Sequence, residues 1–434
     1  EAAVSYADQT VFLFMGGFFI AAAMMRWHLH KRIALHVIEL FGSGPRKLIL
    51  GFMAATAFLS MWISNTATAM MMIPIAMALV ATLMPEAISD ENGGSKEQRQ
   101  FAVCLLLAVA YAATIGGMAT LIGTPPNGIL VAQLSNIFPE APSIDFFSWM
   151  IFAVPFAVIF LAIAWFWLTY VAHRHLPREI SGSREVIHHE LTGMGPLGTG
   201  ERWTLLIFSL VALAWIFRAE KTIGDLVIPG INTYIPGVSD ATIAITGALL
   251  LFLLPVDLEK GIFTLDWESA RKIPWGVLIL FGGGICLSEG IIASGLAKLI
   301  ASSFTVLHVL PLILIVLLIT LLITFLNEVV SNTAIASIMV PLMAITAVSM
   351  GINPMFLMVA AALASSLGFM LPVGTPPNAI AYGTGYISTK EMARAGFALN
   401  IIGCILVTLF MTLVVPMALG LSPEFPAWAV LPGM

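Results

Sequence analysis

The chain has 434 residues, of which 59% are hydrophobic and only 10% are charged, and its mean hydropathy is +0.98. Soluble domains carry about 25% charged residues, so this composition excludes an ordinary soluble domain. The formal net charge of −5 says little about partners, because the loop charges of such a chain serve its topology.

Apolar runs near the length that crosses a bilayer, about 20 residues, recur along the whole chain. In order they include Val11–Met25, Phe101–Ile122, Ile151–Val171, Ala241–Pro255 and Ile401–Leu421. The period-two alternation that is typical of an outer-membrane barrel is absent from the sequence. We therefore predict an all-α polytopic membrane protein, and we expect it in the cell (inner) membrane, embedded in the lipid bilayer.

The basic residues predict how the chain crosses the membrane. Sixteen of the 19 Lys and Arg residues fall in five clusters, which the positive-inside tendency places in the cytoplasm. With these clusters inside, the first apolar helix runs inward and the helix that begins at Trp275 runs outward. The last helix, Ala395–Leu421, then leaves the C-terminus external. The five clusters are Arg26–Lys47, Lys96–Arg99, Arg174–Arg202, Lys260–Lys272 and Lys390–Arg394.

The triplet Ser-Asn-Thr interrupts an apolar region at Ser64–Thr66, although both ends of that region carry cytoplasmic charge. Two full crossings fit this pattern, and so does a re-entrant hairpin whose tip stops inside the membrane. The tip has no charge, Gly or Pro, so we favour the hairpin. The triplet returns at Ser331–Thr333 within a stretch free of Lys and Arg, Ala301–Thr389, which predicts a second hairpin entering from outside.

A second motif, GTPPN, also occurs twice, at Gly123–Asn127 and at Gly374–Asn378. The distance from SNT to GTPPN is 59 residues in the first half and 43 in the second, and the difference of 16 equals the polar insertion Pro85–Gln100. The pair FMGG at 14–17 and LFGG at 280–283 extends the match. Because the first helices of the two halves run in opposite directions, the repeats are inverted, an architecture typical of secondary transporters with a central site.

This repeat divides the chain into four predicted parts. Residues 1–134 form the first inverted repeat and residues 275–390 the second. Residues 135–274 supply scaffold helices and a cytoplasmic loop, and residues 391–434 form a C-terminal helix and tail.

The chemistry of the two motifs favours an anion together with a cation. Two prolines and a glycine break a helix, so GTPPN leaves helix ends at the middle of the membrane. Helix N-termini attract carboxylates, and Ser, Asn and Thr are good N-cap residues with neutral donors. Exposed carbonyls and side-chain oxygens suit sodium. No Lys or Arg lies near either motif in the sequence, so a co-bound cation is the natural complement of a bound anion.

The paired SNT triplets and paired GTPPN breaks closely resemble those of the divalent anion:sodium symporter family, which includes bacterial INDY-type dicarboxylate transporters. The resemblance implies the fold of the ion transporter superfamily, and a homodimer in which a transport domain moves against a scaffold by an elevator mechanism. Sodium and a C4-dicarboxylate such as succinate, fumarate or malate would travel together. Family members carry further scaffold helices ahead of the position that matches Glu1, so we expect an N-terminal portion beyond this sequence.

The resemblance also implies residue roles. The side chains of both triplets would bind substrate carboxylates, with further residues of the breaks adjoining the substrate: Ser64, Asn65, Thr66, Ser331, Asn332 and Thr333, then Thr124, Thr375 and Pro376. Each sodium site would pair a tip with the neighbouring broken helix, one formed by Ser60, Ser64, Asn65 and Gly123 and the other by Asn332 and Gly374.

Two acidic residues lie in apolar surroundings. Glu328 stands just before the second triplet, where the first repeat has Met61. An intramembrane carboxylate is a candidate for function, so Glu328 could take part in coupling by tuning sodium binding or taking a proton, or it could pair with Asn327 or a backbone donor. Glu289 follows the glycine-rich stretch Gly282–Gly284, where we expect a local helix break rather than catalysis.

Several alternatives stay open at the level of the sequence. Citrate or sulfate as cargo, or anion exchange instead of symport, would keep the same fold. An intramembrane enzyme would need a paired acid, a Ser-His constellation or a metal cluster at membrane depth, and the sequence shows none of these. A channel is less compatible with inverted broken helices than a carrier is. We predict no organic cofactor and no nucleic-acid partner.

Overall fold

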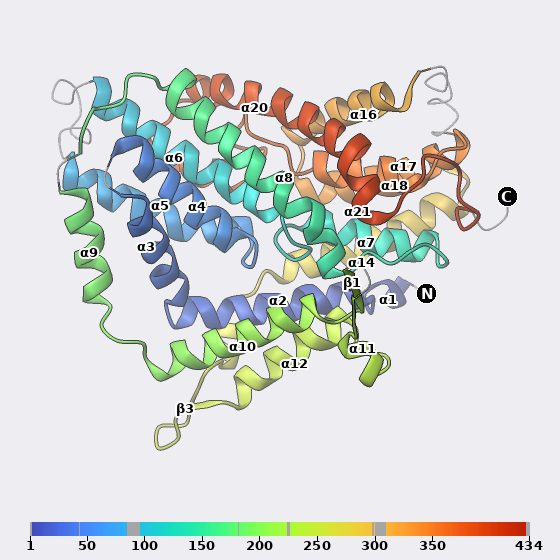
Figure 1. Ribbon diagram of the computed structural model, residues 1–434, viewed down its shortest axis with the longest axis horizontal. Helices are drawn as coiled ribbons and strands as arrows, with labels where there is room; N and C mark the ends of the chain where they lie inside the picture. Colours follow the sequence, from blue (N-terminus) through green and yellow to red (C-terminus); the bar gives the residue numbers. More distant parts are fainter. Residues whose placement is uncertain are drawn as a thin grey trace.

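The computed structural model describes residues 2–42, 44–84, 96–180, 182–223, 226–296, 299 and 310–430. The described part is almost entirely helical, with two short two-stranded ribbons, so the predicted α-helical class is confirmed. Both chain ends lie at the same end of the molecule (Figure 1). Most of the polar insertion Pro85–Gln100 and the beginning of the stretch Ala301–Thr389 lie outside the described residues.

The elements follow one another in three groups. Up to the first break they are α1 (Ala2–Ser5), α2 (Gln9–Arg26), α3 (Leu29–Phe41), α4 (Pro45–Ser60), α5 (Asn65–Leu83), α6 (Lys96–Gly117) and α7 (Pro125–Ile137). The middle part contains α8 (Phe146–Phe166), the π-helical η2 (Trp167–Ala172), α9 (Ser183–Gly193), α10 (Thr199–Ile216), β1 (Lys221–Ile223), β2 (Leu226–Ile228), α11 (Ile231–Tyr234), α12 (Asp240–Leu253), β3 (Pro255–Asp257), β4 (Ile262–Phe263) and α13 (Trp267–Ala270). The last part contains α14 (Trp275–Ala293), α16 (Leu312–Asn327), α17 (Asn332–Ser349), α18 (Pro354–Ala364), α19 (Pro376–Gly383), α20 (Thr389–Leu409), the π-helical η4 (Phe410–Val414) and α21 (Val415–Leu419).

Seven helical segments of the described chain are long and apolar enough to cross a membrane. They coincide with most of the predicted apolar runs, and α12, α14, α16 and α18 are shorter apolar helices. The last segment begins at Thr389 rather than at the predicted Ala395, because Ser388 and Glu391 form a reciprocal capping box that starts α20 one and a half turns earlier. The chain is therefore a multi-pass membrane protein.

The helices fall into two packing groups. Helices α2, α10 and α12 pack on one another along the lower side of Figure 1, and we refer to them as the α2–α10–α12 bundle. Close approach within it depends on Gly16, where a Cβ atom would lie 2.6 Å from the main chain of Ala244. The second group, which we call the hairpin body, comprises α4, α5, α6, α8, α16, α17, α18, α19 and α20.

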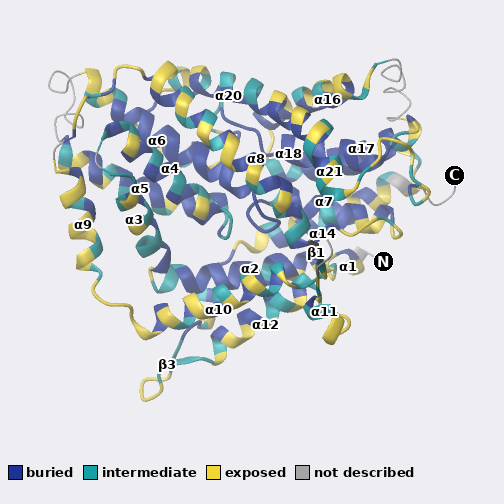
Figure 2. Ribbon diagram, in the orientation of Figure 1, coloured by how far each residue is buried: buried dark blue, intermediate teal, exposed yellow. Residues whose placement is uncertain are grey.

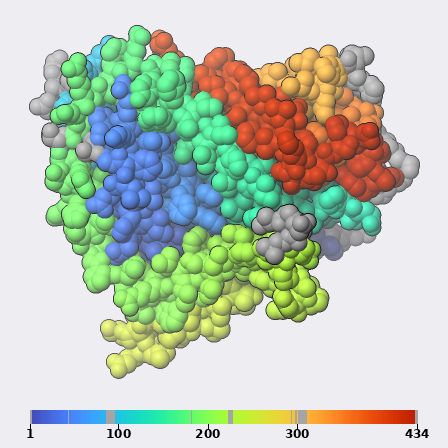
Figure 3. Space-filling view, in the orientation of Figure 1, coloured from blue at the N-terminus to red at the C-terminus, as the bar shows by residue number. Residues whose placement is uncertain are grey.

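Helix α6 is the centre of the hairpin body. Every residue from Phe101 to Gly117 is buried, and α6 packs against α4, α5, α8 and α19. In Figure 2 it is dark blue over most of its length, whereas α9 and the turn between β3 and β4 are largely exposed. The space-filling view shows that the middle part of the chain, in green and yellow, wraps the left and lower margins of the molecule (Figure 3).

The two repeats interlock. Helix α5 follows the first triplet and packs against α19, which follows the second GTPPN. In the same way, α17 follows the second triplet and packs against α7, which follows the first GTPPN. A proline stands inside each triplet helix, Pro74 in α5 and Pro341 in α17, each ten residues after the serine of its triplet. Rings from both halves, Phe14 and Phe281, meet at 4.6 Å beside Gly128, where a side chain would collide with both. The helix that follows each triplet is thus packed against the helix that follows the break of the other repeat.

The break expected at Gly282–Gly284 is wrong, because α14 runs without interruption from Trp275 to Ala293. The glycines instead allow neighbouring helices to approach. A Cβ atom on Gly284 would lie 2.6 Å from Ser337 Oγ on α17, and the Gly284 carbonyl accepts a hydrogen bond from Gln133 Nε2 on α7 at 3.3 Å. Helix α14 therefore approaches α17 and α7 closely at Gly284, where it carries no side chain.

The elements that carry the five basic clusters lie at one end of the molecule, on the left in Figure 1: α3, α9, the starts of α6 and α20, and the β3–β4 turn. An ion pair of 2.8 Å between Arg99 and Glu391 joins the starts of α6 and α20 there. The two chain ends and β1 lie toward the opposite end. This distribution agrees with the topology that the basic residues predict, and we refer to the two ends as the basic end and the terminal end.

Candidate functional site

The first GTPPN interrupts a helix, as its composition predicts. Helix α6 ends at Gly117, residues 118–124 are not helical, and α7 begins at Pro125, where a missing N–H costs nothing. The buried side chain of Asn127 holds the break together, because its Nδ2 donates to the carbonyls of Gly117 (3.3 Å), Met118 (3.3 Å) and Thr120 (2.7 Å).

The first triplet caps a helix beside this break. Helix α4 ends at Ser60 and α5 begins at Asn65, and Ser64 Oγ accepts from the main-chain N–H of Ala67 at 3.4 Å. Ser64 thus acts as the N-cap of α5, and the free N–H groups of the first turn face the tip. Asn65 is buried, whereas Thr66 is half-buried.

Asn65 lies in a shell of oxygen atoms. Its Oδ1 is 2.8 Å from Ser60 Oγ, 3.1 Å from the carbonyl oxygen of Ala113 and 3.2 Å from that of Gly123. Rotation of the Asn65 amide would place its nitrogen at this point as a donor to all three oxygens. With the nitrogen there, the Asn65 amide donates to all three oxygens and holds the first tip against α6 and the first break. The structure therefore brings together Ser60, Asn65 and Gly123, and adds Ala113.

Glycine is required around this shell. A Cβ atom on Gly117 would collide with Asn65 Oδ1, and one on Gly123 would collide with the carbonyl oxygen of Gly117. Thr120 fixes the turn from behind, because its hydroxyl donates to the Met61 carbonyl and accepts from the N–H of Gly123. The first tip and the first break are thus locked together by uncharged groups.

The second tip repeats this plan in outline. Helix α16 ends at Asn327, Ser331 Oγ accepts from the N–H of Ala334 at 3.2 Å, and α17 begins at Asn332. Helix α18 ends at Ala364, and α19 begins at Pro376 after a non-helical segment. Asn378 Nδ2 donates to the carbonyls of Gly368 and Leu371, both at 3.1 Å, just as Asn127 does in the first break. Unlike Ser64, Ser331 is exposed.

Glu328 makes the second tip different. It is 3% exposed, and its carboxylate accepts from the main-chain N–H groups of Phe369 (2.9 Å), Met370 (3.0 Å) and Leu371 (2.9 Å). Asn400 Nδ2 on α20 donates to the same carboxylate at 2.6 Å. Of the roles that the sequence left open, pairing with backbone donors is confirmed, and the described hydrogen bonds include none between Glu328 and Asn327. The sequence did not reveal Asn400, which lies 72 residues away.

Several polar atoms of the second tip and the second break are buried and have no hydrogen-bond partner among the described residues. Asn327 has neither amide atom paired, and Asn332 Oδ1, Ser366 Oγ, Thr375 Oγ1 and Asn378 Oδ1 are likewise unpaired. Each such atom costs about 1–3 kcal/mol unless something completes its hydrogen bonds. Asn327 occupies the repeat position of Ser60 and directs its amide at the second break, 2.9 Å from a Cβ position on Gly368. These groups could contribute ligands for a cation or an anion at the second tip.

The remaining predicted residues lie at the breaks. Thr124 and Thr375 are each 1% exposed and are the N-cap residues of α7 and α19, and Pro376 opens α19. Thr333 is buried in the first turn of α17, where its carbonyl accepts from Ser337 Oγ at 2.9 Å. Gly374 lies beside the carboxylate, since a Cβ atom there would be 2.8 Å from Glu328 Oε2.

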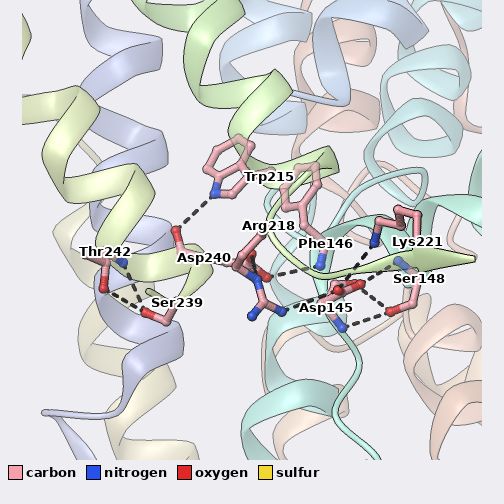
Figure 4. A network of polar contacts seen from close by, with 9 residues as sticks. All are labelled: Asp145, Phe146, Ser148, Trp215, Arg218, Lys221, Ser239, Asp240 and Thr242. Atoms are coloured by element: carbon pink, nitrogen blue, oxygen red, sulfur yellow. Dashed lines mark hydrogen bonds and ion pairs between the residues drawn. The ribbon is translucent and has the colours of Figure 1, made fainter. Parts of the chain in front are cut away.

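An ionic network near the terminal end joins the two helix groups (Figure 4). Asp145, the N-cap of α8, lies 3.4 Å from Arg218 Nη2 and 3.9 Å from Lys221 Nζ, while Arg218 Nε lies 2.5 Å from Asp240 Oδ1 at the start of α12. Asp240 also accepts from the N–H of Phe146 at 3.1 Å. Burial lowers the pKa of Lys221, and the charge of Asp145 opposes that shift. Because α8 belongs to the hairpin body, these bonds tie it to the α2–α10–α12 bundle.

Apolar membrane-crossing helices, two interlocked repeats and two capped helix tips beside two helix breaks define a membrane transport protein. Two solved transporter structures share this fold. MtrF of Neisseria gonorrhoeae, from a class of antimetabolite efflux pumps, has a TM-score of 0.60 at 13% identity and covers 95% of this chain and 83% of its own. The YdaH transporter of Alcanivorax borkumensis has a TM-score of 0.59 at 13% identity, with coverages of 97% and 87%.

Residues 1–420 match the family described as the sodium:sulfate symporter transmembrane region. The chain belongs to this family, the divalent anion:sodium symporters, so the resemblance seen in the motifs is confirmed and the protein is a transporter rather than an enzyme. Relatives named sodium-dependent dicarboxylate transporter SdcS are similar over most of the chain. That of Staphylococcus saprophyticus is 41% identical over 429 residues, 98% of this chain and 80% of its own; that of Staphylococcus aureus strain NCTC 8325 is 44% identical over 422 residues, 97% and 79%.

Proposed function

We propose that the protein couples sodium entry to the uptake of C4-dicarboxylates such as succinate, fumarate and malate across the cell membrane. The pair of capped tips carries this proposal. Each tip offers an asparagine and the N-terminal turn of a long helix, α5 or α17, without a lysine or arginine in either motif. An anion with two separated carboxylates can use both tips at once.

Sodium coupling is supported by the first tip. Ser60 Oγ and the carbonyl oxygens of Ala113 and Gly123 lie within 3.2 Å of the Asn65 amide, and none of these groups carries a charge. A cation bound there would place positive charge beside the anion, which the protein itself does not supply. The names of the staphylococcal relatives, sodium-dependent dicarboxylate transporters, support the same coupling.

The cargo is the point on which the comparisons differ. The family description names sulfate, whereas the relatives at 41–44% identity are named for dicarboxylates. Sulfate carries both charges on one centre and would use one tip, and citrate carries a third carboxylate with no third tip in the repeat. The paired geometry therefore favours a dicarboxylate, and an exchanger of the same fold is the second candidate.

We further propose that the transporter is a homodimer working by an elevator motion, with two re-entrant hairpins. Helices α4 and α16 have 16 residues each, about 24 Å at 1.5 Å per residue, which is less than the about 30 Å of a hydrocarbon core. The hairpin body would move as a unit, with the α2–α10–α12 bundle as part of the stationary scaffold. The ionic network around Arg218 spans these two groups and would have to rearrange during such a motion.

The test is uptake of radiolabelled succinate into proteoliposomes with an inward sodium gradient, against an equal potassium gradient. Sodium-driven accumulation, reduced by unlabelled fumarate and malate more than by citrate or sulfate, is the expected result. Uptake that ignores sodium, or that needs internal anion for counterflow, would leave an exchanger. Stronger competition by sulfate would replace the dicarboxylate assignment.

A further inference from the structure

A cavity of about 820 Å³ opens at the basic end of the molecule, away from the tips and breaks. Its wall consists of the loop that leads into α4, the segment that follows η2, and the start of α6, at the upper left in Figure 1. Four cationic side chains line it, against one acidic side chain, Glu97: Arg46, Lys47, Arg174 and Arg178. A cavity with this balance is suited to an anion.

The four cations outnumber the acidic side chains that line the cavity among the described residues, where Glu97 is the single one. None of the four takes part in the ion pairs of the described residues, whereas Lys31, Arg32 and Arg99 at the same end each pair with a glutamate at 2.8 Å. Four like charges around a single carboxylate raise one another's electrostatic free energy, and a bound anion would lower it.

Two features hold positive charge at the wall of the cavity. The Arg46 guanidinium lies 4.3 Å above the ring of Tyr170, and its Nε donates to the Thr169 carbonyl at 3.4 Å, so its position is fixed by contacts that do not neutralise it. The N-terminus of α4 also opens here: Gly44 is the N-cap without a side-chain bond and Pro45 follows it. The N-terminal end of this 16-residue helix adds positive field to that of the side chains.

The surroundings of the cavity are apolar and aromatic. Trp165 Nε1 donates to the Arg46 carbonyl at 2.9 Å, and Trp165 and Tyr170 are residue types that gather at membrane–water interfaces. The end of α8 and the start of η2 expose large apolar side chains next to it, with Phe166 55% and Val171 47% exposed. A free anion in water would gain nothing from these side chains, but the acyl chains of a lipid would cover them.

We propose that this cavity binds the phosphate group of an anionic phospholipid, with its acyl chains against the exposed side of α8. Arginine pairs well with phosphate because its planar fork can donate two parallel hydrogen bonds. Basic pockets on the cytoplasmic side of membrane proteins hold such headgroups. A lipid bound here links the start of α4, the first arm of the first tip, to the end of α8. The inference does not depend on which anion the protein transports.

The test is native mass spectrometry of the purified, delipidated protein titrated with phosphatidylglycerol and, separately, with phosphatidylcholine. We expect phosphatidylglycerol to bind at least about tenfold more tightly than phosphatidylcholine. The double variant R174Q/R178Q, which changes two exposed residues outside the helices, should weaken phosphatidylglycerol binding about tenfold, and E97Q should strengthen it.

The matched control is K260Q/K272Q, which removes the same charge from the same end of the molecule but from residues paired with Asp257 and Glu268. It should leave phosphatidylglycerol binding unchanged. Equal weakening in both double variants, or equal affinity for the two lipids, would overturn the proposal. Displacement of the lipid by inorganic phosphate or glycerol phosphate at equal concentration would also overturn it, because the site would then select a free phosphate. Thermal melting of each variant separates lost binding from lost folding.

Discussion

At the first tip Met61 follows the end of α4, and its carbonyl accepts from the Thr120 hydroxyl; at the second tip Glu328 takes the same place, and its carboxylate accepts from three main-chain N–H groups. The repeat position of Thr120 is Leu371, which has no hydroxyl and whose N–H is bound by Glu328 instead. One break is therefore fixed by a neutral hydroxyl and the other by a buried negative charge. Inverted repeats can keep one backbone plan while their electrostatics diverge.

The divergence has a consequence for sodium. At the first tip the Asn65 amide lies within 3.2 Å of three neutral oxygens, whereas at the second tip, which carries Glu328, the amide atoms of Asn327 and the Asn332 oxygen are unpaired among the described residues. A buried negative charge strengthens the attraction for a nearby cation over several ångströms. We therefore expect the two proposed sodium sites to differ in affinity, in contrast to the symmetry of their motifs.

The largest effect should come from removing the charge that holds the second break. Glu328→Ala leaves the N–H groups of Met370 and Leu371 and the Asn400 Nδ2 group without their acceptor, while the Phe369 N–H keeps Asn400 Oδ1, and we expect it to destabilise the protein by about 3–5 kcal/mol and to abolish transport. Met61→Ala at the equivalent position should retain most transport. We would measure the melting temperature and the uptake rate of both variants. Similar losses of stability and uptake in Glu328→Ala and Met61→Ala would show that the two tips are equivalent.

Next in size are the two asparagines of the triplets. Asn65→Ala and Asn332→Ala should each reduce sodium-driven succinate uptake by a factor of about 100 or more, because each removes a side chain that we propose as a sodium ligand and a substrate contact. Asn136→Ala, an exposed asparagine near Asp8, is the control. Uptake above a tenth of the wild-type rate in either variant would remove that tip from the site.

The residues that end α4 and α16 probe the sodium sites more selectively. Ser60→Ala should raise the sodium concentration for half-maximal uptake about tenfold, because it removes one proposed sodium ligand at the first tip. Asn327→Ala should change the same quantity in the same direction if Asn327 binds sodium at the second tip. Uptake is measured as a function of sodium concentration for both variants. If the sodium concentration for half-maximal uptake changes in Ser60→Ala alone, the residue that ends the tip's first helix contributes to sodium binding only in the first repeat.

Glycines beside the two tips should differ in tolerance. Gly117→Ala would collide with the Asn65 amide inside a closed shell, whereas Gly368→Ala would approach the end of the Asn327 side chain at 2.9 Å, which can turn away. We expect uptake to fall at least tenfold in the first and less than about threefold in the second. Gly290→Ala, which meets nothing within 4 Å, is the control. The reverse order would mean that the second tip is the more rigid one.

The smallest effects should come from the caps. Ser64→Ala and Ser331→Ala each remove one side-chain cap, worth about 1 kcal/mol, and should lower the melting temperature by a few degrees. Ser64 is half-buried and Ser331 exposed, so water can replace the lost cap bond more easily at Ser331. A larger loss of stability from Ser331→Ala than from Ser64→Ala would contradict this ordering.

The sequence by itself determined the membrane class, the repeat, the positions of the two breaks and the caps of α5 and α17. These are local properties: apolar length, paired prolines after glycine, and a serine ahead of a helix are all written within a few adjacent residues. The family also followed from these motifs. The expected break at Gly282–Gly284 failed because glycine serves close helix packing as readily as it ends a helix.

Only the tertiary structure decided which groups complete the site. The carbonyl of Ala113, 53 residues from Ser60, accepts a hydrogen bond from Ser60 at the first tip, and Asn400, 72 residues from Glu328, donates to Glu328 at the second tip. Main-chain carbonyl and N–H groups are common to nearly every residue, so the residue types alone do not show which of these groups take part in a site. Their roles depend on how α6 packs against α4 and how α16 packs against α20, and that packing is set by the whole core rather than by any single motif.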